Sequence, residues 1–247
     1  MRKPIFIVIV ILAAIVTGGL WGLISGFLKA KFNVHEVVSS IMLNWTAFWL
    51  VYDFIPRFVK DKAIAVKSEP LPFSRTLGLQ WLRDMTGMST LNLGFLIAIA
   101  SCIIIWFILE KTTLGFNLKA VGSNRYCAEY AGIKINRSIM ASMAIAGALA
   151  GLAGLTRYCG YDTLMEMGKM PGEGFDGIAV GLLGNCSPLG VFFAAIFFGA
   201  LKMGKGSLAA TGIPTEIADT IIAIIIYFTA TNIIIASFWN NRFKKSY

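Results

Sequence analysis

The chain has 247 residues, of which 57% are hydrophobic and 14% are charged, and its mean hydropathy is +0.72. Soluble domains carry about 45–50% apolar and about 25% charged residues, so this composition excludes an ordinary soluble domain and indicates an integral membrane protein. The formal net charge is +9, but the basic residues lie at the ends of apolar segments and in loops, where they contact anionic lipid or a partner, so we expect no nucleic-acid partner.

Several continuous apolar segments are long enough to cross a bilayer. A helix needs about 20 residues to cross a hydrocarbon core of about 30 Å, and hydrophobicity that is continuous, not alternating, favours helices over barrel strands. The spanning helices are predicted at residues 4–28, 37–59, 91–109, 138–155 and 217–239. The expected fold class is an all-α polytopic bundle, with one transmembrane domain over residues 1–247.

The junction between the first two segments and the second segment itself contain polar residues. Asn33 and Glu36 are spaced like a capping box at the start of the second helix. Further along, the amide of Asn44 lies in an apolar setting beside Trp45 and Phe48. It either lines a translocation path or makes an interhelical hydrogen bond worth about 1 kcal/mol, and the sequence leaves both open.

Two segments carry stripes of small residues. One stripe lies in the first segment, at Gly18, Gly22 and Gly26, and the other lies at Ser142, Ala146, Ala150 and Gly154 with Gly147 and Gly151 beside them. Small residues four apart let two helix backbones approach closely in a membrane. We interpret both stripes as packing surfaces.

Residues 115–133 form a polar, glycine-flanked stretch between the third and fourth segments. We expect an inter-helix loop that folds and docks onto a soluble partner. If this loop is cytoplasmic, alternation places residues 29–35 on the same side, although the count of Lys and Arg residues does not clearly favour that orientation.

The apolar region at residues 175–203 is interrupted. Residues 175–183 are too few to span, Gly184 to Pro188 break the run, and residues 189–203 follow. Such a break at membrane depth needs protein or water to satisfy the freed backbone groups. The pattern predicts a broken or re-entrant helix pair, with two ordinary helices, the first one short, as the alternative.

No catalytic signature is present in the sequence. It has no phosphate-binding loop ending in Gly-Lys-Ser/Thr and no serine elbow, and His35 is the only histidine. The four cysteines show no metal-ligand spacing. We therefore expect no enzyme activity, no cofactor and no metal.

Three motifs and their order carry a resemblance to a known family. They are Leu-Lys-Ala-Val-Gly-Ser-Asn-Arg-Tyr-Cys-Ala-Glu-Tyr-Ala-Gly-Ile at 118–133, Ala-Gly-Ala-Leu-Ala-Gly-Leu-Ala-Gly at 146–154 and Gly-Phe-Asp-Gly-Ile-Ala-Val-Gly-Leu-Leu-Gly at 174–184. Over about residues 18 to 240 the chain resembles the permease subunits of bacterial ABC importers for ribose-type sugars, branched-chain amino acids and nucleosides. Residues 31–44 resemble the nucleoside-type branch.

The resemblance implies a coupling role for the stretch at 115–133, because in that family the Val-Gly-x-Asn loop contacts the cytoplasmic ATPase as a short coupling helix. Here Ser123 or Asn124 can cap such a helix and Gly132 can end it in a left-handed conformation. Small residues would let it sit in a groove, and Tyr126 and Tyr130 could anchor it. The coupling residues implied are Gly122, Asn124, Arg125, Ala128, Ala131 and Gly132, with the small Cys127 beside them.

The resemblance also suggests a gate at the start of the interrupted region. Phe175 and Asp176 open a half-helix whose end Asp176 could cap. With Asn44, Trp45 and Phe48 they are the candidates for the translocation path, since aromatic faces can stack on a nucleobase.

The implied assembly has four kinds of component in the bacterial cytoplasmic membrane. They are this multi-pass permease, a second permease subunit paired with it as a heterodimer, a cytoplasmic ATP-binding subunit and an extracytoplasmic substrate-binding lipoprotein, all surrounded by membrane lipid. Import of ribose-type sugars or branched-chain amino acids remains an alternative, as does a non-transporting scaffold for an ATPase. Family members usually carry additional N-terminal helices, so we expect this chain to lack them.

Overall fold

The computed structural model describes residues 3–58, 67–72, 76–78, 92–168 and 170–210, with isolated positions between 214 and 231. Within these residues the regular structure is helical, apart from one isolated antiparallel bridge between Lys67 and Glu166. The all-α fold class is confirmed. The chain divides into two compact units, Met1–Met170 and Pro171–Tyr247, and each is described by itself.

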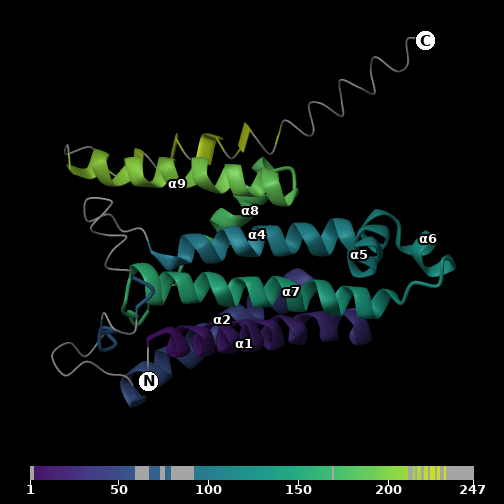
Figure 1. Cartoon of the computed structure of the whole chain (residues 1–247), viewed down its shortest axis with the longest axis horizontal. Coiled ribbons are helices and arrows are strands. Elements are labelled where there is room, and N and C mark those ends of the chain that lie inside the picture. Colours follow the sequence, from purple (N-terminus) through teal and green to yellow (C-terminus); the bar gives the residue numbers. More distant parts are fainter. Residues whose placement is uncertain are drawn as a thin grey trace, which may run out of the picture. The chain divides into compact units, whose positions relative to one another are not determined.

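The first unit contains most of the described helices (Figure 1). They are α1 (Lys3–Phe32), α2 (Glu36–Phe58), α4 (Leu93–Lys111), α5 (Thr113–Ser123), α6 (Arg125–Tyr130), α7 (Ile135–Thr156) and the π-helical turn η2 (Arg157–Tyr161). Four of them, namely α1, α2, α4 and α7 with η2, are long and apolar enough to cross a membrane. Their bounds lie within a few residues of the predicted segments.

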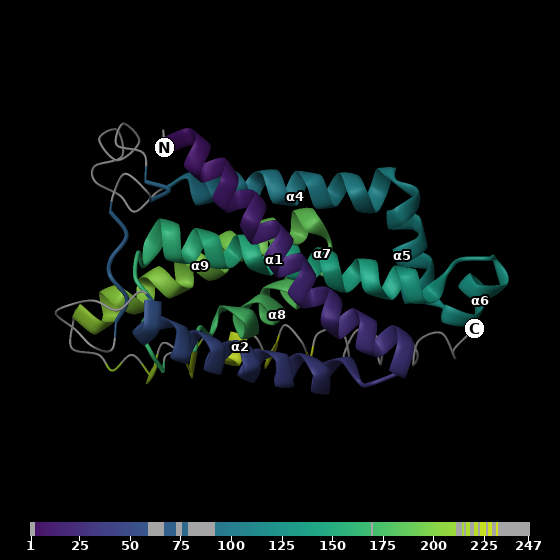
Figure 2. The same cartoon turned by 90° about the horizontal axis from the view of Figure 1, so that it is seen from below.

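Glycines bring α1 and α7 into backbone contact, and Figure 2 shows the two helices crossing. A Cβ atom on Gly18 would lie 2.4 Å from the carbonyl oxygen of Gly147, and one on Gly151 would lie 2.2 Å from that of Ala14. Farther along, Gly26 contacts Met140, so the two helices run antiparallel. The predicted tight packing is confirmed.

The face of α7 that packs on α1 differs in part from the predicted stripe. Met143, Gly147 and Gly151 make the contact, whereas a Cβ atom on Gly154 would meet nothing within 4 Å. Small residues cover both faces of α7. The face with Gly147 and Gly151 makes the contact because glycine allows the shorter separation between the two helix backbones.

The start of the predicted loop at 115–133 is itself a helix, α5. The Thr112 side chain caps it by accepting a hydrogen bond from the Gly115 amide at 3.2 Å. A Cβ atom on Gly115 would lie 2.2 Å from the Ile108 carbonyl oxygen, so the tight corner between α4 and α5 requires glycine. Beyond this corner α5 lies across the end of the bundle, at a steep angle to α4 and α7 (Figure 2).

Up to residue 210, the described part of the second unit consists of a short and a long helix joined by a tight turn. They are α8 (Glu173–Leu183) and α9 (Pro188–Ala210), and Pro188–Lys205 is long and apolar enough to span. Ala179 and Val180 of α8 are buried against Ala194 and Phe198 of α9. The first helix is as short as predicted, and the second is longer than residues 189–203. The predicted span at 217–239 lies largely outside the described residues.

Candidate functional site

One residue, Asn124, both ends α5 and begins α6. Its backbone is extended, with φ −152° and ψ 110°, and its amide donates to the Ala120 carbonyl at 3.0 Å. Its side-chain oxygen accepts from the amides of Tyr126 and Cys127 at 3.0 and 3.1 Å. The predicted cap is confirmed at Asn124, and it satisfies two amides that a six-residue helix otherwise leaves unpaired.

The other end of α6 is closed by Gly132. Its φ is +80°, a left-handed conformation that strains any L side chain. The Gly132 amide donates to Glu129 at 2.9 Å, and the next amide, of Ile133, donates to Ala128 at 3.0 Å. The predicted helix end is confirmed. Both ends of α6 are therefore closed by hydrogen bonds within the chain.

The two faces of α6 differ sharply in exposure. Ala128 is 3% exposed, whereas Tyr126 and Tyr130 are 75% and 96% exposed. Ala128 thus packs on its own chain and does not enter a partner's groove, which corrects the expectation for that residue. The two tyrosines, one helical turn apart, form the outward face of α6 and are free to contact another protein.

The remaining coupling candidates lie around this helix and are accessible. A Cβ atom on Gly122 would meet nothing within 4 Å, and Ala131 is exposed at the end of α6. Arg125, the first residue of α6, is exposed and forms no ion pair with a described residue. All six candidates therefore gather in one continuous segment at one end of the first unit.

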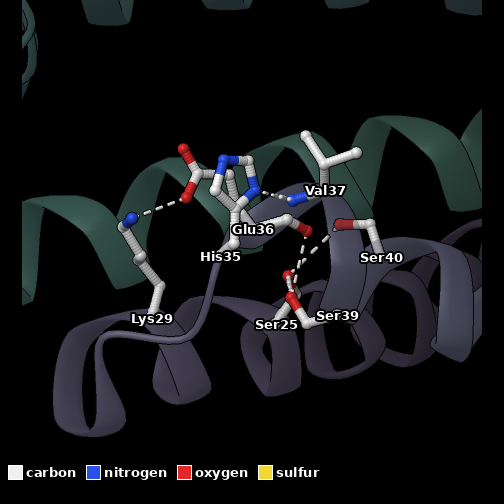
Figure 3. Close-up of polar contacts among 7 residues, drawn as sticks. All are labelled: Ser25, Lys29, His35, Glu36, Val37, Ser39 and Ser40. Atoms are coloured by element: carbon white, nitrogen blue, oxygen red, sulfur yellow. Dashed lines mark hydrogen bonds and ion pairs between the residues drawn. The ribbon is translucent and has the colours of Figure 1, made fainter.

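The turn between α1 and α2 lies at the same end of the first unit as α5 and α6 (Figures 1 and 2). Figure 3 shows the contacts that hold it. Lys29 pairs with Glu36 across the turn at 2.7 Å, and the hydroxyl of Ser25 lies 3.0 Å from that of Ser39 and 3.3 Å from that of Ser40. Ser25 and Ser39 are both buried, so these hydroxyl groups satisfy each other.

The start of α2 differs from the capping-box prediction. Asn33 has φ 52° and donates its amide to the Lys29 carbonyl at 3.1 Å, so it ends α1 and does not cap α2. The cap is His35, whose Nδ1 accepts from the Val37 amide at 3.4 Å (Figure 3). The prediction was wrong because Asn suits a left-handed helix end as well as a cap, and spacing alone does not separate the two.

On α2, the translocation-path candidates form a polar and aromatic strip in which Asn44 and Trp45 are exposed and Phe48 is half-buried. Asn44 is exposed, and its side-chain nitrogen lies 3.7 Å from the Met170 sulfur. The Phe48 ring packs edge-on against Trp45 and Trp49, with centroids 5.7 and 5.5 Å apart. Sequence analysis named Asn44, Trp45 and Phe48 but not Tyr52, one turn beyond Phe48, which contacts Phe48 and Trp49.

The two candidates on α8 have different surroundings. Phe175 is 73% exposed. Asp176 forms an ion pair with Lys202 of α9. The capping role expected for Asp176 is wrong: Gly172 occupies the N-cap position of α8, and no side chain caps it. An acid in a first helical turn can pair with a base from another helix, and sequence spacing within one helix does not reveal such a partner.

Metal-binding groups are scattered in the described part of the chain. No three His, Cys, Asp or Glu residues there lie close enough together to hold a metal ion. Cys102, Cys127, Cys159 and Cys186 form no disulfide with one another.

Comparison with known proteins places this architecture in a family. Residues 2–230 match the model described as branched-chain amino acid transport system / permease component. The chain is 41% identical over 224 residues to the guanosine ABC transporter permease protein NupP of Bacillus subtilis (strain 168), covering 90% of this chain and 64% of NupP. It is 36% identical over 238 residues to the nucleoside ABC transporter permease protein NupB of Lactococcus lactis subsp. cremoris (strain MG1363), covering 94% of this chain and 65% of NupB.

A more distant relative is the glucose ABC transporter permease protein TsgB13 of Haloferax volcanii, 29% identical over 229 residues, which cover 90% of this chain and 60% of TsgB13. No solved structure matches. The chain thus spans slightly less than two thirds of the length of these relatives. With its membrane-spanning helices and a match over nearly its whole length, this multi-pass membrane protein belongs to the permease-component family of branched-chain amino acid transport systems.

Proposed function

We propose that this chain is a permease subunit of an ATP-driven importer in the bacterial cytoplasmic membrane and that its substrates are nucleosides. Identity with relatives named as guanosine and nucleoside permeases supports the substrate class. The observation that carries the mechanism is α6, a helix held at both ends that turns Tyr126 and Tyr130 outward. This face is the contact for a separate ATP-binding subunit.

The links of α6 to the bundle make it a suitable lever. A single residue, Asn124, joins it to α5, and a hydrogen-bonded turn joins it to α7. Along Gly147 and Gly151, α7 is in backbone contact with α1, so a push on α6 moves α7 and α1 together. Closure of the ATP-binding subunit is thereby converted into a shift of spanning helices, because packed helices move as discrete units.

The proposed path runs beside α2, where the Asn44 amide offers hydrogen bonds and Trp45, Phe48 and Trp49 offer ring faces for a base. In the second unit, Phe175 and the ion pair of Asp176 with Lys202 are a separate candidate for a gate. Asparagine and tryptophan suit a nucleoside because it carries both polar edges and an aromatic face.

The transporter also requires partners. Bacillus subtilis has two proteins named guanosine ABC transporter permease, NupP and NupQ, which are 41% and 30% identical to this chain over their matched regions. Lactococcus lactis likewise has NupB and NupC. Such pairs support a heterodimer of this chain with a second permease, supplied by an extracytoplasmic binding lipoprotein.

Uptake by membrane vesicles that contain the assembled transporter tests this proposal. ATP should drive uptake of labelled guanosine in preference to ribose or leucine. Tyr130→Asp should abolish uptake without unfolding the bundle, because this side chain is 96% exposed. The control is Tyr161→Asp, which changes a 66% exposed tyrosine at the opposite end of α7 and should leave uptake intact.

Two results would contradict the proposal. Preferential uptake of ribose or leucine would reject nucleosides as the substrate class. Binding of the ATP-binding subunit to vesicles that take up none of the three compounds would favour a scaffold.

A further inference from the structure

A polar pocket lies between α6 and the start of α7. Its volume is about 390 Å³, and the charged and amide side chains that line it are those of Arg125, Glu129, Lys134, Asn136 and Arg137. All five residues are exposed, and Ile135 in the same lining is buried at 9% exposure. The pocket thus combines an apolar floor with a charged rim.

The pocket gathers positive charge that the described residues leave without ion pairs. Three cations face one acid, and none of the three forms an ion pair with a described residue. The other basic side chains described between α1 and η2 are compensated. Lys29, Arg57, Lys67, Lys119 and Arg157 pair with carboxylates, while Lys31 and Lys111 lie over aromatic rings.

The position of the pocket along α7 corresponds to the membrane surface. Gly26 of α1 contacts Met140 of α7, and because the helices are antiparallel, Arg137 lies level with Lys29, near the end of the α1 span. Helix α5 lies across this same end of the bundle (Figure 2). A bilayer spanned by Ile135–Tyr161 would place Lys134 and Arg137 at the depth of the lipid headgroups.

We propose that this pocket binds the phosphate of one anionic phospholipid of the cytoplasmic leaflet. Arg125, Lys134 and Arg137 surround the phosphate, and the Asn136 amide hydrogen-bonds the headgroup. Glu129 leaves a net charge of +2 in the pocket, which discriminates against zwitterionic lipids. The inference rests on the proposed function only for its cytoplasmic orientation.

An acidic segment of the ATP-binding subunit is the competing occupant. The observations favour lipid because the pocket opens beside the first turn of a spanning helix, whereas the exposed tyrosines form a separate outward face of α6. The bound lipid would hold α6 against α7 and so link lipid composition to the stiffness of the lever.

The effect of removing two cations follows from surface electrostatics. A Lys or Arg near an anionic membrane surface contributes about 1 kcal/mol, which is roughly a fivefold change in affinity. Replacing both Lys134 and Arg137 by Gln should thus weaken binding of an anionic lipid by roughly twenty-five-fold.

Native mass spectrometry of the full chain in detergent micelles tests this expectation, with phosphatidylglycerol as the probe and phosphatidylcholine of the same acyl chains as the reference. The pocket variant is Lys134→Gln with Arg137→Gln. The control, Lys111→Gln with Lys119→Gln, removes the same charge near the same end of the unit without touching the pocket. A melting curve confirms that each variant is folded.

The expected result is one retained phosphatidylglycerol in the unmodified chain and in the control, and its loss in the pocket variant. Equal retention by both variants would overturn the site. Displacement of the lipid by inorganic phosphate at equal concentration would show that the pocket binds a free anion. Displacement of the lipid by the ATP-binding subunit would show that the pocket binds that protein. Either result contradicts the proposal. Since this assay uses no ATP or nucleoside, it can fail while uptake succeeds, and the reverse.

Discussion

The contact between α1 and α7 predicts that a single methyl group at the right glycine destabilises the bundle. In Gly147→Ala the new Cβ atom would lie 2.3 Å from the Gly18 carbonyl oxygen and 2.9 Å from the Gly22 Cα. Carbon atoms in contact normally lie about 3.5–4.0 Å apart, so the two helices must separate by roughly 1 Å. Overpacking of this kind costs about 1–3 kcal/mol.

The same helix provides the control. In Gly154→Ala the Cβ atom meets nothing within 4 Å, and Ala is a better helix former than Gly, so this change should be neutral or slightly stabilising. Thermal unfolding of the purified chain in detergent measures both. We expect Gly147→Ala to lower Tm by several degrees, at about 2–4 °C per kcal/mol for a chain of this size. Equal melting temperatures for the two variants would refute the close approach of α1 and α7.

Three further predictions concern single contacts. Asn124→Ala should cost about 1 kcal/mol of α6 stability and speed hydrogen exchange at the first amides of the helix, whereas Asn124→Asp should not; unchanged exchange in the Ala variant would contradict the cap. Ser25→Ala leaves the buried Ser39 hydroxyl without this partner and should lower Tm by a few degrees, for a loss of about 1 kcal/mol, and an unaltered Tm would count against it. Asp176→Lys should reduce the yield of folded protein and Lys202→Asp should restore it in the double variant, so failure of this rescue would argue against the ion pair.

The elements of this fold that depend on local chemistry could be predicted from the sequence. Apolar runs set the spans because their length must match the bilayer. The short helix α6 was expected from the family resemblance, and its ends could be assigned to Ser123 or Asn124 and to Gly132, since a cap and a left-handed glycine act on neighbouring amides in the chain. The glycines of α1 and α7 also indicated a close approach of two helices, because small residues four apart in one helix allow it whatever the partner helix is.

The features that sequence reasoning missed depend on contacts between distant residues or on a choice between local roles. Helix α5 was taken as loop because its N-cap, Thr112, is also the C-cap of α4, so no separate connecting segment marks its start. Asp176 pairs with a base 26 positions away, on another helix. Asn33 suits both a helix end and a cap, and only the backbone conformation distinguishes them.

The proposed lipid pocket is another feature that depends on contacts between distant residues. Its cations come from α6 and from the start of α7, and they count as unneutralised only when the partners of the other basic residues are known. The sequence alone gives the net charge but not which charged side chains pair in the folded structure.

The central claim is that α6 faces the cytoplasm and meets the ATP-binding subunit there, and Cys127 provides a direct measurement. This thiol is exposed on α6. With Cys102, Cys159 and Cys186 replaced by Ala, a membrane-impermeant maleimide should label Cys127 in inside-out vesicles but not in intact cells, and the bound ATP-binding subunit should protect it. Labelling in intact cells, or labelling that the ATP-binding subunit does not reduce, would contradict the account.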